Sequence, residues 1–379
     1  MNDPLPSGPL TNRKDDGEVQ NSPATATLDK WLAELVLLSG SDLLLVAGTP
    51  VSILSEGAVK IIGTRVLDGN AIEGAVIPAL SPYALKMYRE GRIADSSYRV
   101  TNLGRFRINL HQERGSAAAA IRALPSKVPD FPDLHLPSSV QSLARLARGL
   151  VVIGGPAGSG KTTTLAALLN EINRSTSRHI VIIEDPMEYE HRHNRSIIEQ
   201  IEIGTDAPDF PTALRAALRQ APDVIVVGEM RDAETMRIAV AAAETGHLVF
   251  STLHTTDVAT TVSRIADSFP LERQNTIRQE LAMSLTAVLT QILLPSKHGG
   301  RYPVAELLMV SYGARQHIRR NNLQNLHQEI TLTKKLGSFT LEESLVQLIA
   351  NGHISREEAL VCAIHPDDLD ILLKMDRRT

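Results

Sequence analysis

The spacing of apolar residues changes along the chain and divides it into regions. Residues 1–27 are rich in Pro, Asn, Asp, Ser and Gly, which predicts a disordered leader. From Leu28 to Leu38 apolar residues recur at helical spacing until Gly40, which predicts a helix. Short strands are then predicted at 43–47, 52–54, 59–62 and 105–110, with a helical stretch at 71–89 that breaks at Ser81-Pro82. This mixture predicts a small α+β domain over residues 28–124.

A proline-rich segment at 125–138 follows and is predicted to be a stiff linker between two domains. Apolar β-rich runs at 150–153, 180–183, 224–227 and 248–252 then alternate with helical patterns. Such alternation predicts an α/β domain over 139–295, with a mostly parallel sheet covered by helices. Beyond Pro270 the pattern predicts helices at 271–294, 312–318, 340–350 and 355–363, so residues 296–379 are expected to be mainly helical.

Composition narrows the function classes. The 379 residues include 39 Lys and Arg against 43 Asp and Glu, for a net charge of -4, and aromatic residues make up 3%. Neither value favours a nucleic-acid-binding protein. The single cysteine, Cys362, excludes an internal disulfide and a multi-cysteine zinc module and suits a reducing cytosol. No apolar run approaches the roughly 18 residues of a membrane span, so we expect a cytoplasmic protein.

The strongest chemical signal is a complete G-x-x-x-x-G-K-[ST] phosphate loop, preceded by an apolar strand and followed by a helical stretch. Its glycines let backbone N–H groups converge on phosphate oxygens at a helix N-terminus. Lys161 is predicted to reach the β- and γ-phosphates, and the Thr162 hydroxyl to bind Mg²⁺. The alternative is a glycine-rich turn without a ligand. The predicted nucleotide-binding residues here are Gly155, Pro156, Ala157, Gly158, Ser159, Gly160, Lys161, Thr162 and Thr163.

Acidic residues follow the second apolar run. Glu184, Asp185 and Glu188 lie within five positions at a predicted strand end, where an open α/β sheet binds its ligands. Carboxylates in this position suit metal coordination, for which Glu184 and Asp185 are candidates, or alignment of an attacking water. A solvated acidic turn is the alternative.

Two further strand ends carry candidates. The run Val224–Val227 is followed by Gly228 and Glu229, which resembles a Walker B element whose carboxylate holds Mg²⁺ through water. The fourth run is bracketed by His247 and His254, either of which could sense the γ-phosphate. For each histidine alone, a hydrogen-bonded structural role is the alternative.

These motifs together resemble the secretion-ATPase superfamily, and most closely the retraction ATPases of type IV pili. Four motifs occur in the family's order: the phosphate loop, an aspartate box at 183–188, the Walker B region at 228–232 and a histidine box at 245–255. The resemblance implies a RecA-like P-loop ATPase domain, a smaller PAS-like amino-terminal domain and a helical carboxyl-terminal region. It also implies a homohexameric ring that hydrolyses ATP to ADP with Mg²⁺, with nucleotide held between the two domains.

The resemblance also assigns roles to residues. Glu188 corresponds to the catalytic glutamate that polarises the attacking water, and Glu229 to the Walker B residue near Mg²⁺. His247 and His254 match the two family histidines, and two further arginines before Walker B match in the same way, Arg215 and Arg219. In the first domain Arg107 and Arg122 are arginine-finger candidates, because a guanidinium can neutralise charge on the transferring phosphoryl group. A basic strand edge is the alternative for these two.

Several positions depart from the family pattern. Leu44 and Leu54 stand where the family usually has His and Arg, and Ile201 stands where it usually has Arg. Residues 314–320 occupy the place of a family motif needed for retraction but differ from its usual amino-acid sequence. The expected function is therefore an ATP-driven retraction motor for twitching motility. The alternatives are an accessory paralogue with low turnover and a pilus assembly or type II secretion ATPase.

The resemblance also implies the cellular context. The expected partners are other copies of the chain, an inner-membrane pilus platform protein and, for an accessory subunit, a paralogous motor ATPase. The expected location is the cytoplasmic side of the inner membrane at the pilus base. Neither zinc nor nucleic acid is expected as a ligand.

Overall fold

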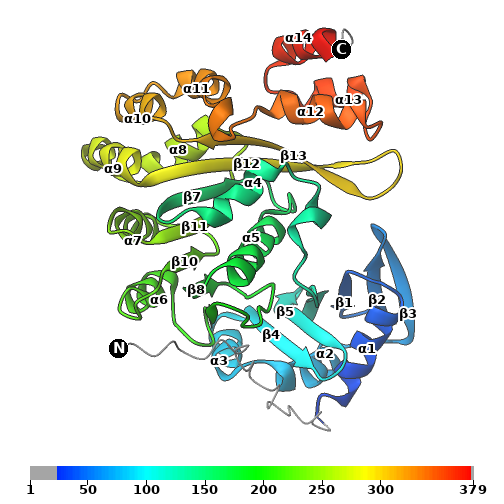
Figure 1. Ribbon diagram of the computed structural model, residues 1–379. Helices are drawn as coiled ribbons and strands as arrows, with labels where there is room; N and C mark the ends of the chain where they lie inside the picture. Colours follow the sequence, from blue (N-terminus) through cyan, green and yellow to red (C-terminus); the bar gives the residue numbers. More distant parts are fainter. Residues whose placement is uncertain (1–23, 377–379) are drawn as a thin grey trace.

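The computed structural model describes residues 24–376 and contains two β-sheets that follow one another along the chain (Figure 1). The amino-terminal sheet lies at one end of the molecule, the second sheet lies in the middle, and helices α10–α14 lie at the other end. Most of the predicted leader lies outside the described residues, and its last residues belong to helix α1, which begins at Ala26.

The amino-terminal domain is built on a six-stranded antiparallel sheet with strand order β3-β2-β1-β6-β5-β4. Its helices pack apolar side chains such as Leu28, Leu32 and Ile72 against the sheet. The elements are α1 (Ala26–Leu37), β1 (Asp42–Val46), β2 (Pro50–Ser55), β3 (Ala58–Val66), α2 (Gly69–Val76), α3 (Pro82–Gly91), β4 (Ala94–Val100), β5 (Gly104–Glu113) and β6 (Ser116–Ala123).

Strands β4 and β6 were not among the predicted elements. The β6 sequence contains the run Ala117–Ala120, and alanine has the highest helix propensity. Burial between β1 and β5 decides its conformation instead, because Ala117, Ala118 and Ala119 are all at most 3% exposed. Tertiary packing thus overrides local propensity in this strand.

The segment between the domains is packed against the second domain. Phe131, in a short 3₁₀ turn, is buried in an apolar cluster of the second domain, and Asp130 accepts a hydrogen bond from Asn170. Helix α4 (Ser138–Gln141) then leads into the second sheet. The proline-rich segment is therefore fixed to the larger domain.

The second domain contains a seven-stranded sheet with order β13-β12-β7-β11-β10-β8-β9, parallel except for the β12–β13 pair. Both faces are buried: Leu150 and Val152 pack into one apolar cluster, Val151 and Ile153 into another. The elements are β7 (Gly149–Gly154), α5 (Lys161–Ser175), β8 (His179–Glu184), β9 (Ile197–Glu202), α6 (Phe210–Ala217), β10 (Val224–Val227), α7 (Ala233–Glu244), β11 (Leu248–Leu253), α8 (Val258–Asp267), α9 (Leu271–Ser284), β12 (Leu285–Pro295) and β13 (Arg301–Met309).

One secondary-structure prediction was wrong. The predicted helix at 271–294 ends at Ser284, and the chain continues as strand β12. An apolar run that is buried on both sides carries no period that separates strand from helix, so the sequence pattern was ambiguous there. The proposed boundary between 295 and 296 consequently falls inside the β12–β13 hairpin, and β13 extends the seven-stranded sheet.

The carboxyl-terminal region beyond β13 is helical, with α10 (Tyr312–Arg319), α11 (Leu326–Leu332), α12 (Leu341–Ala350), α13 (Arg356–Cys362) and α14 (Pro366–Asp376). Leu341, Leu345 and Leu369 form a small apolar core with Val304 of β13. This fourth cluster attaches the last helices to the edge of the sheet.

Candidate functional site

The phosphate loop connects β7 to α5 at the carboxyl edge of the parallel strands. Gly155, Gly158 and Gly160 all have positive φ values, of 153°, 74° and 85°. A Cβ on Gly155 would lie 2.4 Å from both the Gln291 backbone oxygen and the Ser159 Oγ. Glycine is therefore required there by conformation and by space, as expected for a loop whose backbone N–H groups face a ligand.

Lys161 begins helix α5, and its side chain is folded over the loop. Its Nζ donates hydrogen bonds to the backbone oxygens of Gly155, at 2.7 Å, and Pro156, at 2.9 Å. Burial lowers the pKa of this ammonium, while the nearby carboxylates of Glu229 and Glu188 oppose the shift. The positive charge is thus held at the mouth of the loop, where phosphate oxygens would bind.

The carboxylates converge from two neighbouring strands. Glu184 ends β8, and burial raises its pKa to about 8, with the Glu188 carboxylate adding to the shift. Burial also raises the pKa of Asp185, which lies 3.8 Å from the Arg231 guanidinium. Glu229 follows β10 and accepts a hydrogen bond from Arg231 Nε at 2.9 Å. Arg231 partly compensates these carboxylates, whose oxygens are the hard ligands that a divalent cation prefers.

His254 connects the loop to the acidic group. Its Nδ1 lies 3.4 Å from Lys161 Nζ, and its Nε2 lies 3.3 Å from Glu229 Oε1. It therefore lies between the two residues expected at the phosphates and at the metal. In this position His254 can transmit a change at the phosphates to the metal site, and the reverse.

These residues line one cavity of about 280 Å³ between the two domains. Arg107 and Arg122 reach it from β5 and β6, where they occupy directly opposed positions. Arg107 lies 3.4 Å from Asp95, and Arg122 donates to Asp42 at 2.8 Å. The lining residues are Arg107, Arg122, Ala157, Gly158, Lys161, Thr162, Leu165, Glu184, Asp185, Pro186, Glu188, Phe210, Gly228, Glu229, Arg231, Thr252 and His254.

Three predicted nucleotide-binding residues outside the phosphate loop also do not line the cavity. His247 immediately precedes β11, so it lies at the amino ends of the parallel strands, away from the phosphate loop. Its Nδ1 contacts the Ala242 backbone oxygen at 3.0 Å. Arg215 pairs with Glu234, and Arg219 donates to the Arg215 backbone oxygen at 2.9 Å. Within this chain these three residues have structural partners, so their predicted contact with nucleotide is not supported by the geometry.

Other loop residues support the cavity without lining it. Gly155, Pro156, Ser159 and Gly160 form the body of the loop. The Thr163 hydroxyl lies 3.1 Å from the Tyr189 hydroxyl, which joins the start of α5 to the segment after the aspartate box.

Gln291 on β12 is a functional candidate that the sequence did not indicate. Its side chain is 2% exposed, donates to the Ser159 backbone oxygen at 2.7 Å and accepts from the Thr164 hydroxyl at 2.9 Å. Because residues 271–294 were predicted as a helix, no pattern placed this side chain beside the loop. Arg231 was noticed only as part of the Walker B region, and Phe210 and Thr252 were not proposed as lining residues.

The residue set fits a nucleotide with a divalent cation. Backbone N–H groups, the α5 N-terminus and Lys161 suit phosphates. The Thr162 hydroxyl and the Glu229, Glu184 and Asp185 carboxylates supply the hard oxygen ligands that Mg²⁺ prefers. Separately, none of the helices among residues 24–376 combines the length and apolarity needed to cross a bilayer.

Several known proteins are similar to this chain over most of its length. The family model described as "Type II/IV secretion system protein" matches residues 135–360. The "Type IV pilus retractation ATPase PilT" of Pseudomonas aeruginosa is 39% identical over 328 residues, which cover 86% of this chain and 95% of the relative. The "Type IV pilus ATPase PilU" of the same organism is 34% identical over 348 residues, covering 92% and 91%. A crystal structure of the pilus retraction motor PilT with bound ADP matches with a TM-score of 0.81 at 40% identity, covering 89% of this chain and 97% of that one.

Proposed function

Because the chain belongs to the type II/IV secretion system protein family, we propose that it is an ATP-hydrolysing motor that powers retraction of type IV pili. The observation that carries this proposal is the interdomain cavity. It combines a phosphate loop, an acidic group and two arginines that come from the other domain. Such a site is complete only when the two domains are correctly placed, which ties hydrolysis to domain movement.

We assign the chemistry as follows. Glu188 polarises the water that attacks the γ-phosphate, and Lys161 neutralises charge on the β- and γ-phosphates. Arg107 and Arg122 stabilise the negative charge that spreads over the transferring phosphoryl group. His254 lies between Lys161 and Glu229 and responds to loss of that group.

Mg²⁺ is the proposed metal, and when bound it would supply charge neutralisation at the phosphate oxygens. Thr162 and Glu229, the latter through water, are the proposed holders, with Glu184 and Asp185 near them. Because burial raises the pKa of Glu184 to about 8, we assign metal binding to Thr162 directly and to Glu229 through water.

We further propose a homohexameric ring located at the cytoplasmic side of the inner membrane, at the pilus base, where it acts on a platform protein. Similarity to the pilus motor relatives supports self-association. Size-exclusion chromatography with light scattering, with and without nucleotide, tests the ring directly.

Hydrolysis is tested by measuring Mg²⁺-dependent release of phosphate from ATP by the wild type and by Glu188→Gln. The wild type is expected to turn over and the variant is not. No turnover above the variant in assembled rings contradicts the motor. Deletion of the gene then tests the direction of force: retraction predicts excess surface pili without twitching, whereas loss of pili supports an assembly ATPase.

A second candidate is an accessory retraction subunit with low turnover. The departures from the family pattern at Leu44 and Leu54 favour it. Complementation separates the two: a main motor restores twitching in cells that lack any other retraction ATPase, and an accessory subunit does so only beside a paralogue.

A further inference from the structure

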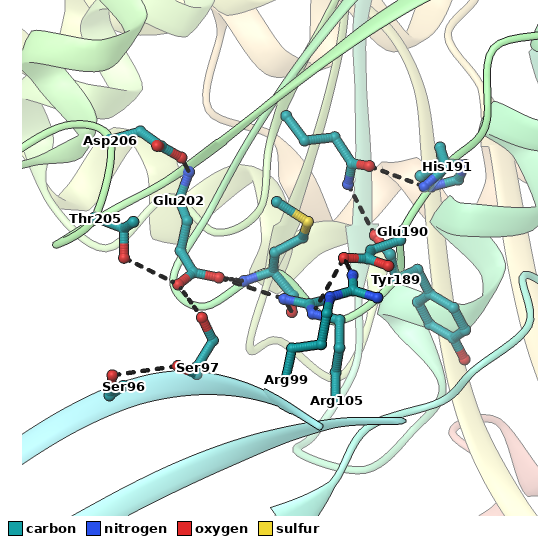
Figure 2. Close-up of polar contacts among 12 residues, drawn as sticks. Ser96, Ser97, Arg99, Arg105, Tyr189, Glu190, His191, Glu202, Thr205 and Asp206 are labelled. Atoms are coloured by element: carbon teal, nitrogen blue, oxygen red, sulfur yellow. Dashed lines mark hydrogen bonds and ion pairs between the residues drawn. The ribbon is translucent and has the colours of Figure 1, made fainter. Parts of the chain in front are cut away.

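A second polar contact joins the two domains beside the cavity, and it centres on Arg105 and Glu202. Arg105 lies near the start of β5 in the amino-terminal domain, and Glu202 ends β9 in the ATPase domain. Figure 2 shows the two side chains directed toward each other, with Ser97, Arg99 and Glu190 around them. Arg105 Nη2 lies 3.5 Å from Glu202 Oε2.

The pair holds the backbone of a single residue, Met187. The Met187 N–H donates to Glu202 Oε2 at 3.1 Å, and the Met187 carbonyl accepts from Arg105 Nη2 at 3.0 Å. Both backbone polar groups of Met187 are therefore satisfied by the ion pair. The next residue in the chain is Glu188, which lines the cavity.

The contact is buried, whereas most ion pairs between residues 24 and 376 are partly exposed. The Arg105 side chain is 10% exposed and that of Glu202 is 6% exposed. Burial lowers the pKa of Arg105, and the Glu202 carboxylate opposes that shift. One guanidinium nitrogen, Arg105 Nη1, is buried without a hydrogen-bond partner. A charge in such surroundings is held only while its partner is in place.

Further contacts join the same segment to both domains. Ser97 of β4 donates to Glu202 Oε1 at 2.6 Å, and Arg105 Nε lies 3.4 Å from Glu190. On the other side Gln200 donates to the Tyr189 backbone oxygen at 2.8 Å and accepts from the His191 N–H at 2.8 Å. The segment 187–191 is thus attached to the amino-terminal domain and to β9 at the same time.

We propose that Arg105 and Glu202 are positioning residues that fix Glu188 for hydrolysis only when the amino-terminal domain is docked. Arg105 acts through the Met187 carbonyl, so withdrawal of β5 removes one support of the residue before Glu188 and exposes the Glu202 charge. This device is separate from Arg107 and Arg122, which face the cavity itself. It rests on the proposed function, because the role of Glu188 does.

The test compares conservative variants of the pair with a charge-matched control. Arg105→Lys keeps the charge but loses the planar fork, and Glu202→Gln keeps an acceptor but loses the charge. Arg99→Lys is the control, because Arg99 pairs with the partly exposed Glu190 and, among the contacts of the described residues, reaches neither Met187 nor Glu202. We expect kcat to fall at least about tenfold in the two pair variants with KM within about threefold, since a displaced catalytic group slows chemistry more than binding. The control is expected to stay within about twofold of the wild type.

Amide hydrogen exchange without nucleotide provides a second readout. The Met187 N–H donates a hydrogen bond to the Glu202 carboxylate. This N–H is expected to exchange at least about tenfold faster in Glu202→Ala than in the wild type. It is also expected to exchange faster in Arg105→Lys than in Arg99→Lys. The double variant Arg105→Lys/Glu202→Gln is expected to lose no more kcat than the worse single variant, because both act through one contact.

Two results would overturn the proposal: pair variants that match the Arg99 control in kcat, or unchanged exchange at Met187. Equal losses in kcat and in nucleotide affinity would also overturn it, because they indicate general damage. A wild type without ATP hydrolysis contradicts the proposed function instead, and the exchange measurement then still decides whether the pair holds Met187.

Discussion

Arg107 and Arg122 are directly opposed on the neighbouring strands β5 and β6, and both line the cavity that contains Lys161. Side chains at opposed positions of an antiparallel pair project from the same face of the sheet. Two guanidinium groups from one domain therefore face the phosphate loop of the other. Each also has an acidic neighbour in its own domain, Asp95 or Asp42.

This arrangement predicts that Arg107 and Arg122 are each required for turnover and that neither is required for folding. Arg107→Ala and Arg122→Ala are each expected to lower kcat at least about 100-fold, because charge on the transferring phosphoryl group loses a counter-charge. Steady-state phosphate release measures the effect, with Arg89→Ala on exposed α3 as a control. Near-normal kcat in both variants would show that these arginines form only a solvated strand edge.

Substitutions of Lys161 and Glu188 are expected to have different effects on nucleotide binding and on hydrolysis. Lys161→Ala should abolish nucleotide binding, because the loop loses its only lysine and the phosphates lose that charge. Glu188→Gln should keep nucleotide affinity within about threefold and lose hydrolysis, since only water activation is removed. Equilibrium binding of a fluorescent ADP analogue distinguishes them. Equal affinities in the two variants would contradict the roles assigned here.

Gln291→Leu is expected to destabilise the phosphate loop, because Gln291 hydrogen-bonds to Ser159 in the loop and to Thr164 in α5. The change leaves the Ser159 carbonyl and the Thr164 hydroxyl without their buried partner. The expected cost is about 1–3 kcal/mol of stability, together with weaker nucleotide binding. Thermal unfolding with and without ADP measures both effects, and Gln220→Leu, on an exposed turn, serves as control. A variant with wild-type stability and affinity would show that Gln291 supports nothing.

Glu306 predicts a pH dependence of stability. It is buried on β13 and accepts from the Val258 N–H at 2.9 Å, and burial raises its pKa to about 7 from the ordinary 4.5. Between those values the folded chain binds more protons at Glu306 than the unfolded chain does, so the contribution of this group to stability is fully present below about pH 4.5 and is lost as pH rises through about 7.

The size of this contribution is on the order of 3 kcal/mol. Glu306→Gln removes the charge, so its melting temperature should exceed that of the wild type by more at pH 8 than at pH 5. Glu272→Gln on the surface of α9 is the matched control. A difference between wild type and Glu306→Gln that is the same at both pH values would contradict the assignment.

Local sequence patterns predicted the parts of the fold that local chemistry determines. The phosphate loop could be recognised because its glycines, lysine and threonine are constrained by one another within a single turn. The strands β7, β8, β10 and β11 were visible as apolar runs because both faces of the sheet are buried. The catalytic role of Glu188 came from the family resemblance, since three carboxylates at one strand end do not reveal which acts on water.

Contacts between distant segments could not be predicted in this way. Gln291 supports the loop only because β12 lies beside β7, and β12 was expected to be helical. Glu202 ends β9, which no pattern had indicated, and its contact with Arg105 depends on how the two domains meet. His247 is the reverse case: a motif position predicted it at the nucleotide, while within this chain it lies before β11, at the end of the strand away from the phosphate loop.

The hairpin of β12 and β13 has a mechanical consequence. Its registered positions run from Ala287↔Met309 to Pro295↔Arg301, and β13 carries the last helices through Val304 and the bridge from Leu307 to Phe339. A force applied to those helices along the strand direction is distributed over all the backbone hydrogen bonds between β12 and β13. The strand that bears it, β12, also contributes Gln291, so tension at the carboxyl-terminal end is delivered to the residue that supports the phosphate loop.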